Sequence, residues 1–587
     1  MILNPFKKHD VSEFPGVLVP LEQAEHRNSI VSQRRMSQVD SPDHVAAEKD
    51  SQKDKTAEPG RSSSVASVNH GTAKPGATIG LTLQDLRAEV EQDVAANDTH
   101  SAYDMKSKVI NRALSDIGMG RYQWELFVLC GCGWLADNLW LQGIALTLPS
   151  LSAEFGVSET EVRYTTLALF LGLCIGASFW GVASDIVGRR LAFNFTLCFA
   201  GVFGIAAGFG PNWIGTAALY ACLGLGVGGN LPVDGALFLE FLPGANGNLL
   251  TLLSVFWPVG QLVSSLLAWA FIPNFSCAAG AEVCARADNW GWRYFIITLG
   301  CLSMAMFICR FFLFHLFESP KFLLSRGRQA EAVAVIHGIA YKNKCKTWIT
   351  EDILNQIGGD PEVHNDVKLS TIDIVKRSMG KFSTQRIGPL FSTRTLGLTT
   401  CLLWFQWTTI GMGYPLFNAF LPQYLANSGG GQAQSVGTVY RNYAITSIVG
   451  VPGSFLAYYT VNIKHIGRKR TMSVAAIITG VFIFLFTISS DEDFQLAFSC
   501  LEAFFQNIMY GVLYAYTPEV FPAPYRGTGT GISSCLNRIA GLCAPIVAVN
   551  AATANPKSPI YASAALILVA GLSMFALPIE TMGRQTL

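Results

Sequence analysis

The chain has 587 residues, of which half are hydrophobic and only 14% are charged. Ordinary soluble domains carry about 25% charged residues, so this is not an ordinary soluble protein. The 42 basic and 41 acidic residues nearly cancel, without the basic excess of nucleic-acid-binding proteins or the acidic bulk of a buffer or chaperone. We therefore expect no nucleic-acid partner.

Residues 1–105 are rich in Ser, Lys, Glu, Asp, Gly and Pro and poor in aromatic residues. Such a composition buries too little apolar surface to offset the entropy of the chain, so we predict a disordered tail with at most one short amphipathic helix near residues 83–94. No apolar run of signal-peptide length precedes residue 125, and we expect no cleaved signal.

From about residue 125 the sequence changes to apolar stretches near twenty residues long. This length crosses a hydrocarbon core of about 30 Å, and lipid forces each stretch to be helical because it offers the backbone no hydrogen-bond partners. We predict an all-α membrane protein with twelve spans, at residues 126–148, 162–183, 191–209, 214–238, 249–272, 294–316, 395–421, 439–461, 471–489, 494–516, 527–550 and 559–578.

A polar, Lys- and Arg-rich segment separates the sixth span from the seventh, and basic residues also gather in the short loops on the same side. Because Lys and Arg accumulate in cytoplasmic loops, we place both termini and this segment in the cytoplasm and favour the plasma membrane. The predicted parts are a cytoplasmic tail at 1–105, a six-helix half at 106–316, a cytoplasmic central loop with short helices at 317–394, a second six-helix half at 395–578 and a cytoplasmic C-terminus at 579–587.

The loop after the fifth span then faces outward. There Cys277 and Cys284 have the setting for a disulfide, and Asn274 begins an acceptor pattern for a glycan. No group of His and Cys has the spacing of metal ligands, and neither a phosphate-binding loop nor a serine nucleophile elbow occurs. We therefore expect no metal, no cofactor and no enzymatic activity.

Two short sequence motifs each occur twice in the chain, and the distance along the sequence between the two copies is the same for both motifs. Gly188-Arg189-Arg190 reappears as Gly467-Arg468-Lys469, and Glu240-Phe241-Leu242-Pro243 reappears as Glu519-Val520-Phe521-Pro522, both 279 residues later. An identical displacement of two unrelated signatures indicates duplicated six-helix halves. Parallel repeats of this kind occur in transporters whose substrate site lies between the halves near the middle of the membrane.

These residues carry a family resemblance. Gly181, Asp185, Gly188, Arg189 and Arg190 resemble the loop motif between spans 2 and 3 of the major facilitator superfamily. The segments 318–321 and 519–527 resemble sugar-porter-type signatures. Residues 117–124, 134–137 and 228–235 narrow the resemblance to a fungal branch similar to synaptic vesicle glycoprotein-like and bacterial niacin-type transporters.

The resemblance implies cytoplasmic charge clusters that link helices in one conformation and release them in the other. The chain departs from the family pattern, because Gly247 stands where an Arg would pair with Glu240, and we expect Glu240 to pair with Arg310 instead. A static helix-end cap is the alternative role for these groups. The gating candidates are Asp185, Arg189, Arg190, Glu240, Glu519 and Arg526.

Four ionisable residues inside predicted spans are the best functional candidates, because each is unfavourable there unless paired or hydrated. Asp137 is the first choice for a proton carrier, and Asp234 and Glu502 are further proton-coupling candidates. Arg538 remains charged, so it requires either an anionic substrate or a permanent carboxylate partner, for which Glu502 is the candidate. Permanent ion pairing that fixes helix packing is the alternative role for these residues.

Amide and aromatic residues near these charges are candidates for substrate binding, although aromatic residues at helical spacing more often pack than bind. Asn230 and Gln506 lie one turn from Asp234 and Glu502. The predicted substrate-binding set is Arg538, Asn230, Gln406, Tyr414, Asn418, Gln506, Asn507 and Tyr510.

The resemblance and the charges together predict a monomeric secondary active transporter that works by alternating access. Its expected cargo is a small polar organic solute, with a carboxylate favoured because of Arg538, and protons are the expected coupling ion. An exporter of metabolites or drugs and a facilitative sugar carrier are alternatives with the same fold. A non-transporting membrane nutrient sensor is the alternative from another class.

Overall fold

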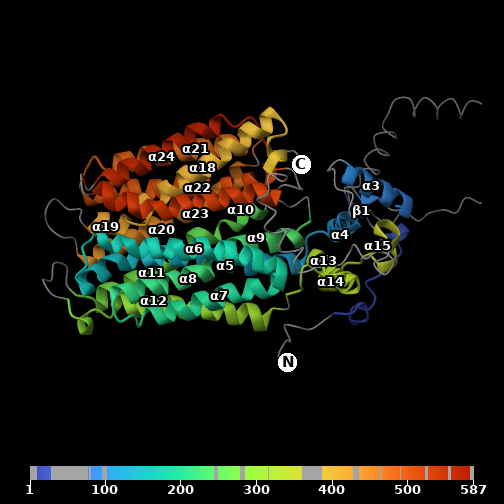
Figure 1. Cartoon of the computed structure of the whole chain (residues 1–587), viewed down its shortest axis with the longest axis horizontal. Helices are drawn as coiled ribbons and strands as arrows, with labels where there is room; N and C mark the ends of the chain where they lie inside the picture. Colours follow the sequence, from blue (N-terminus) through green and yellow to red (C-terminus); the bar gives the residue numbers. More distant parts are fainter. Residues whose placement is uncertain are drawn as a thin grey trace, which may run out of the picture.

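The computed structural model consists of a long helical bundle and a small helical domain at one end of it (Figure 1). We call the two ends of the bundle the domain end and the far end. The structure describes residues 9–24, 26–27, 77–78, 81–95, 102–243, 249–277, 284–314, 316–359, 387–426, 435–461, 463, 466–489, 491–521, 526–552, 555 and 557–581.

The first half of the bundle holds six spans, two of which are interrupted. Its helices are α5 (Arg121–Phe155), α6 (Tyr164–Val187), α7 (Arg189–Ala207), α8 (Trp213–Val227) with α9 (Asn230–Phe241), α10 (Leu249–Leu253) with α11 (Phe256–Phe275), and α12 (Gly291–Ile308), which ends in a π turn at Cys309–Leu313.

The second half also holds six spans. Its helices are α18 (Arg394–Asn418) with the short α19 (Leu421–Ala426), α20 (Val436–Thr460), α21 (Gly467–Phe486), α22 (Glu492–Val520), α23 (Arg526–Ala552) and α24 (Ser558–Phe575). The predicted all-α architecture of twelve spans is thereby confirmed.

Helix packing repeats between the halves. In the first half α5 packs on α11, α6 on α8 and α7 on α12, and the corresponding pairs α18 on α23, α20 on α22 and α21 on α24 form in the second. Contacts of α11 with α20 and of α6 with α23 join the halves. The duplication in the sequence thus reappears as duplicated packing.

Nine of the described spans are long and apolar enough to cross a membrane by length and composition, and α5, α18 and α20 are not among them. These three helices carry buried polar residues such as Gln142, Gln406 and Asn442, which face other helices. Their lower hydropathy follows from their place between the halves, where fewer of their side chains need to be apolar.

Close packing of α6 on α8 depends on glycine. A Cβ added at Gly224 would lie 2.5 Å from the carbonyl oxygen of Leu169, and one at Gly172 would lie 2.0 Å from that of Ala221. Small residues let backbones approach in this way, as the apolar context of these glycines predicts.

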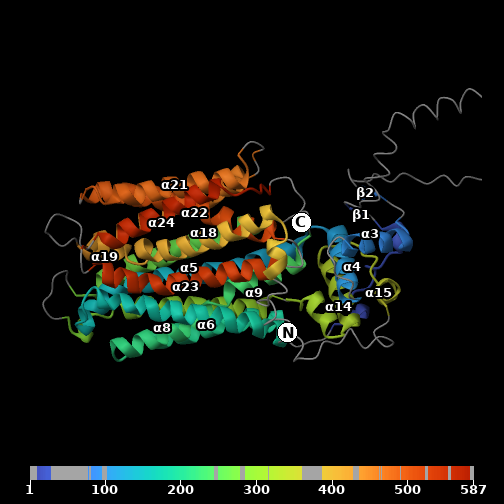
Figure 2. The same ribbon diagram turned by 45° about the horizontal axis from the view of Figure 1, so that its top comes forward.

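The small domain is built from two separate parts of the sequence (Figures 1 and 2). One part comprises the short helices Val11–Glu13 and Leu21–Gln23, the two-residue strands β1 (His26–Arg27) and β2 (Ala77–Thr78), α3 (Leu83–Ala95) and α4 (Ala102–Ile117). The other comprises α13 (Pro320–Ser325), α14 (Gln329–Lys342) and α15 (Glu351–Gly358), and a short helix at Gly388–Phe391 leads into α18.

The prediction of a disordered tail over residues 1–105 is wrong for residues 9–24, whereas α3 is the short helix expected near residues 83–94. Leu18 bridges to Thr347 of the central loop, and Val17, Leu86 and Val90 are buried. The segment at 9–24 packs against the central loop and α3 packs against α4, partners that the composition of the tail alone does not reveal. Helix α4 also belongs to this domain, so the first half begins at α5 rather than at residue 106.

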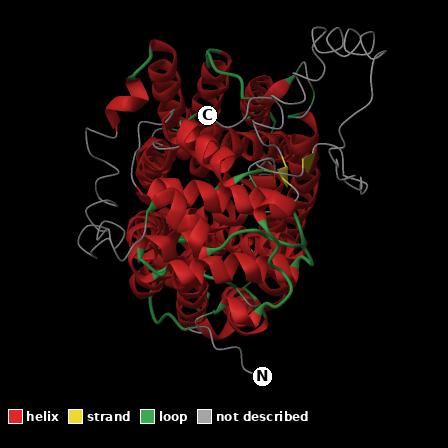
Figure 3. Cartoon of the chain, turned by 90° about the vertical axis from the view of Figure 1, so that its right-hand side faces the viewer, coloured by secondary structure: helices red, strands yellow, loops and turns green. Residues whose placement is uncertain are grey.

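Seen from the domain end, the described residues are almost wholly helical, and the antiparallel pair of β1 and β2 is short (Figure 3).

At the far end, the loop between α11 and α12 is closed by a disulfide between Cys277 and Cys284, whose Cα atoms are 5.9 Å apart. Asn274 lies within α11, and its amide donates to the carbonyl oxygen of Ala270 at 2.8 Å. Glycosylation at Asn274 stays a prediction.

Candidate functional site

Asp137 and Asp234 lie close together in the first half but have different partners. Asp137, in the middle of α5, accepts a hydrogen bond from the amide of Asn230 at 3.4 Å. Asp234, one turn after Asn230 on α9, forms an ion pair with Arg310 at 2.9 Å. A Cβ at Gly133 would lie 1.6 Å from Oδ2 of Asp234, so glycine is required where α5 passes this carboxylate.

Arg310 has several partners besides Asp234. Its guanidinium also donates to the carbonyl oxygens of Leu129 and Phe193 and lies 3.8 Å from the centroid of the Phe193 ring. The expectation that Arg310 pairs with Glu240 is therefore wrong, because the guanidinium is turned into the bundle toward Asp234. This buried pair has the geometry of a permanent structural contact.

Arg538 reaches across the interface between the halves. It lies on α23, is 7% exposed and donates to the carbonyl oxygen of Leu173 on α6 at 3.1 Å. Its charge acts on Asp137 and on Tyr514. Among the described residues no direct ion pair joins Arg538 to a carboxylate, so the alternative of a permanent pair with Glu502 is wrong.

Glu502 lies on α22 among amides. Its Oε1 accepts hydrogen bonds from Gln506 at 2.6 Å and from Asn418 at 3.3 Å. The predicted grouping of Glu502, Gln506 and Asn418 is thus present. Gln406 is fully buried, and neither atom of its side-chain amide has a hydrogen-bond partner in the described part of the chain.

An aromatic cluster fills the centre of the interface between the halves. Trp257 lies 4.9 Å from Tyr514 and 5.5 Å from Tyr510, measured between ring centroids, and Tyr414 lies 5.6 Å from Tyr510. The hydroxyl of Tyr414 also meets Oδ1 of Asn138 at 3.5 Å. Trp134 and Trp407 complete the cluster by packing on Tyr514.

Two placements differ from the grouping expected of the predicted binding set, whose role in binding stays a prediction. Asn507 donates to the carbonyl oxygen of Ala503 and packs beside Gly450 of α20, so it lies against a neighbouring helix instead of joining the central group. Trp134 was not predicted to bind substrate, although its place three residues before Asp137 on the same helix was a usable signal.

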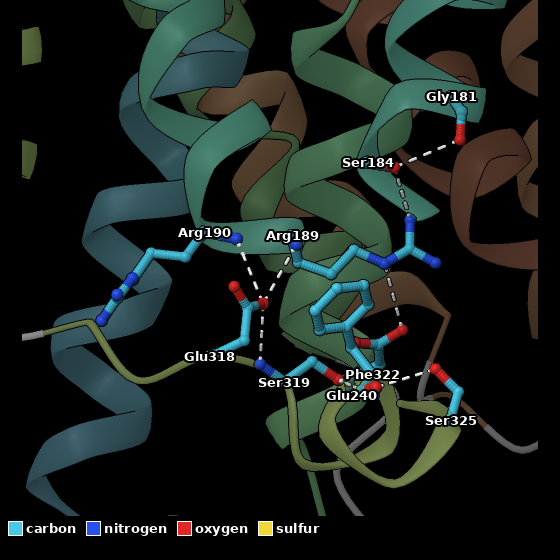
Figure 4. Close-up of polar contacts among 9 residues, drawn as sticks. All are labelled: Gly181, Ser184, Arg189, Arg190, Glu240, Glu318, Ser319, Phe322 and Ser325. Carbon is cyan, nitrogen blue, oxygen red and sulfur yellow. Dashed lines mark hydrogen bonds and ion pairs between the residues drawn. The ribbon is translucent and has the colours of Figure 1, made fainter. Parts of the chain in front are cut away.

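At the domain end, a charge cluster ties the start of α7 to the segment after α12 (Figure 4). Arg189 lies 3.5 Å from Glu240 and donates to the hydroxyl of Ser184 at 2.8 Å. Oε1 of Glu318 accepts the backbone N–H groups of Arg189 at 3.0 Å, Arg190 at 3.3 Å and Ser319 at 3.0 Å. Burial raises the pKa of Glu318, whereas these hydrogen bonds oppose that shift.

The second half repeats the cluster. Arg468 pairs with Glu519, and Glu580 accepts the backbone N–H groups of Arg468 at 3.1 Å and Lys469 at 3.2 Å. Arg468 and Glu519 follow Arg189 and Glu240 by the same 279 residues that separate the repeated motifs of the sequence. Glu240 therefore has a local partner in spite of Gly247. The side chains of the predicted gate residues Asp185 and Arg526 lie outside the described residues.

Glu580 was missed by the sequence reasoning. The signal for it was the pattern Glu-Ser at 318–319, which recurs as Glu-Thr at 580–581 after the last span. Gly188 and Gly467 precede the two helices with φ angles of +116° and +64°, a backbone region that favours glycine. A Cβ at either position would also crowd the glutamate.

At the far end, Arg163 joins the halves. It is 6% exposed and donates to Oε1 of Gln423 at 3.0 Å and to the carbonyl oxygen of Ala548 at 3.3 Å. Its guanidinium lies 5.0 Å from the centroid of Phe420 and 5.7 Å from that of Tyr424. Arg163 was not among the candidate residues predicted from the sequence.

Comparison with known proteins agrees with this architecture. The MFS siderochrome iron transporter 1 of Ceriporiopsis subvermispora (strain B) is 43% identical over 523 residues, covering 87% of this chain and 99% of that protein. The synaptic vesicle 2-related protein of Xenopus laevis is 25% identical over 495 residues, covering 81% of this chain and 82% of that protein. A solved structure of the proton:xylose symporter XylE bound to 6-bromo-6-deoxy-D-glucose superimposes with a TM-score of 0.58 at 18% identity, covering 79% of this chain and 98% of that one.

The predicted resemblance is confirmed by these relatives. The sequence model of the Major Facilitator Superfamily matches residues 128–465 and 396–586, which together span both six-helix halves. The chain belongs to the Major Facilitator Superfamily and is an integral multi-pass membrane transporter.

Proposed function

We propose that the chain is a proton-coupled carrier of small organic carboxylates, working by alternating access in the plasma membrane with both termini in the cytoplasm. The observation that carries this proposal is the position of Arg538. This buried guanidinium of the second half donates to a backbone carbonyl of α6 in the first half, and among the described residues it forms no ion pair with a carboxylate. A buried arginine in this situation favours an anionic ligand.

Charge balance explains how protons would couple to the anion. When empty, the site holds Arg538 and an ionised Asp137, whose charges offset each other. When loaded, a proton neutralises Asp137 and the substrate carboxylate takes its place as the counter-charge of Arg538. Binding of only the proton or only the anion leaves a net charge in a site of low dielectric constant, which is unfavourable during reorientation.

The clusters at the domain end support the proposed cycle. Arg189 with Glu240 and Arg468 with Glu519 bind helix ends within each half, so each half moves as one body. The contacts of Arg163 then hold the far end closed while the domain end changes.

The test is a ligand panel on the purified full-length chain. We expect hydroxycarboxylates or aromatic carboxylates, but not neutral sugars, to raise the midpoint of thermal unfolding, and to do so more strongly at pH 5.5 than at pH 7.5. A ligand at 100 times its dissociation constant stabilises by about 2.7 kcal/mol. Arg538→Gln should remove this stabilisation while the protein without ligand stays folded.

Arg441→Gln serves as the matched control, because Arg441 is half-exposed and pairs with Glu492 within its own half. Unchanged carboxylate binding by Arg538→Gln would contradict the anion site. A neutral sugar that stabilises equally at both pH values would favour facilitated diffusion of sugars.

The name of the relative at 43% identity provides a second candidate, transport of an iron-loaded siderochrome. The same panel separates the two candidates when one siderochrome is included with and without iron. Stabilisation by the iron-loaded form alone would favour this second function.

A further inference from the structure

Glu502 is a buried carboxylate without a basic partner in the described part of the chain. It is 1% exposed, and only its Oε1 is held by protein donors, the amides of Gln506 and Asn418. Oε2 is buried and accepts no hydrogen bond from the described residues. Asp234 and Glu154 each pair with an arginine, whereas Asp137 and Glu502 are hydrogen-bonded to amides. The charged form of such a buried carboxylate is unfavourable, so the group needs a proton or a cationic partner at some stage of the cycle.

Aromatic rings lie near this carboxylate. Tyr414 lies one turn before Asn418, the amide that donates to Glu502, and the ring centroids of Tyr414 and Tyr510 are 5.6 Å apart. Tyr414 reaches the first half through Asn138, so Glu502 lies at the boundary between the halves and not against lipid. The faces of aromatic rings attract cations, and a carboxylate beside them adds a full negative charge.

We propose that Glu502 and these tyrosines form a subsite for a nitrogen-bearing group of the transported solute. The unpartnered Oε2 accepts a hydrogen bond from an ammonium group, and the rings cover its apolar neighbours. This inference rests on the proposed function and deepens it, because a solute that also offers a carboxylate to Arg538 is an amino acid or another zwitterion. Glu502 then binds cargo, whereas Asp137 carries the proton.

The positions along α18 set the shape of this solute. Gly411 packs against the backbone of Asn537, the neighbour of Arg538, and Asn418, seven residues later, donates to Glu502. At a rise of 1.5 Å per residue, these two contacts are roughly 10 Å apart along the helix axis. The long side chains of Glu502 and Arg538 shorten the gap. A solute that contacts both charges therefore needs an extended body with the ammonium and carboxylate at opposite ends.

The experiment uses two matched series of probes on the purified full-length chain at pH 7. One series is the straight ω-amino acids from 4-aminobutanoate to 8-aminooctanoate. The other is the alkanoates of equal length, from pentanoate to nonanoate, in which a methyl group replaces the ammonium. Binding is measured as the shift in the midpoint of thermal unfolding over a concentration series. We expect ω-amino acids to bind more tightly than their alkanoates, with an optimum at one chain length.

Glu502→Gln should remove this preference by weakening ω-amino acid binding about tenfold to a hundredfold, as expected for loss of a hydrogen bond to a charged group, and leave alkanoate binding unchanged. Glu492→Gln is the matched control, because Glu492 begins the same helix, about 15 Å from Glu502 along its axis, and pairs with Asn442 and Arg441. Glu502→Asp, which retains the charge, should keep the preference and move the optimum to a longer chain.

The Asp variant also decides the result if Glu502→Gln does not fold. An equal preference in wild type and Glu502→Gln, or an optimum unmoved in Glu502→Asp, would overturn the subsite. Binding of alkanoates without any advantage for the ammonium would overturn the subsite and leave the carboxylate carrier standing. Absence of binding in both series would overturn the subsite, and the carboxylate carrier would then be decided by the panel of hydroxycarboxylates and aromatic carboxylates.

Discussion

Two buried aspartates of the first half have different surroundings and therefore different expected roles. Asp234 has an arginine of its own, Arg310, which is fixed by two backbone carbonyls. Asp137 has an amide neighbour and the more distant charge of Arg538 from the other half. Protonation of Asp137 breaks no direct ion pair, and an anionic substrate can then take its place as the counter-charge of Arg538, whereas protonation of Asp234 would leave the enclosed Arg310 without its partner.

We predict that Asp137→Asn retains exchange of labelled carboxylate between the two sides of a vesicle but loses accumulation driven by a proton gradient. The neutral amide resembles the protonated acid, so the site binds the anion yet cannot release the proton. Both rates are measured in proteoliposomes, with protein-free vesicles subtracted. Accumulation that persists at the wild-type level would show that the proton is carried elsewhere.

Asp234→Asn is the control for this substitution and should fail differently. It leaves Arg310 without its counter-charge, and loss of one partner of a buried pair costs about 3 to 5 kcal/mol. We therefore expect a lower unfolding midpoint and less folded protein, whereas Asp137→Asn should unfold near the wild-type midpoint.

The sequence alone could identify which residues carry charge inside the membrane but not their partners. Asp137, Asp234, Glu502 and Arg538 stand out from apolar spans because each is unfavourable there. Their pairing depends on the rotation of each helix about its axis, and a rotation of one residue moves a side chain by about 100°. For this reason Arg310 was expected to meet Glu240 but meets Asp234.

At the scale of elements, the starts of α7 and α21 are bound alike. Each start follows a glycine of positive φ and presents its backbone N–H groups to a glutamate, Glu318 or Glu580, that lies after the last helix of the same half. The partial positive charge of a helix N-terminus adds to these charge-assisted hydrogen bonds. The third and sixth spans of each half are thereby joined at the domain end.

We predict that Glu318→Gln and Glu580→Gln each lower stability by about 1 to 3 kcal/mol, because the neutral amide weakens the hydrogen bonds to the charged acceptor. Thermal unfolding of the two single variants and the double variant measures this, and the two effects should add because the sites are in separate halves. A large effect from one and none from the other would contradict the equivalence of the halves.

Arg163 is expected to determine how firmly the far end closes. We predict that Arg163→Gln speeds amide hydrogen exchange in α19 and in the last turn of α23. The substitution removes the hydrogen bonds that the guanidinium donates to Gln423 of α19 and to the carbonyl oxygen of Ala548 in α23. Arg163→Lys should give most of the same effect, since an ammonium cannot reproduce the two directional bonds of the guanidinium.

Arg441→Gln, at the same end but paired within its own half, is the matched control and should leave this exchange unchanged. Slow exchange in α19 of Arg163→Gln would mean that Tyr440, whose hydroxyl donates to the carbonyl oxygen of Leu146 at 2.6 Å, closes the far end without Arg163.

At the scale of the whole molecule, the six-plus-six architecture could be predicted because membrane spans are long, apolar and repeated. The small domain could not, because its core joins segments more than two hundred residues apart. Lys106 of α4, for example, is buried and donates to Gln329 of α14. Apolar residues of both segments share one core, so the composition of either segment alone does not reveal the domain.

One polar cluster unites the three parts of this domain. The ring nitrogens of His26 lie 2.9 Å from Oδ2 of Asp116 and 2.9 Å from the carbonyl oxygen of Leu21, and Trp348 donates to the same Asp116 oxygen at 2.9 Å. His26 is fully buried, so both of its nitrogens depend on these partners. The cluster links the N-terminal segment, the helix before the first span and the central loop.

We predict that His26→Ala speeds hydrogen exchange in Leu21–Gln23 and α4 without changing exchange in the twelve spans, because two buried hydrogen bonds and a packed ring are lost only from the small domain. Arg87→Gln is the control, since the pair of Arg87 with Glu91 is exposed and contributes little. Faster exchange that extends into α5 would show instead that the domain braces the first span. In that case the residues before the membrane would affect the transport cycle itself, and His26→Ala should change the rate of carboxylate exchange as well as the stability of the domain.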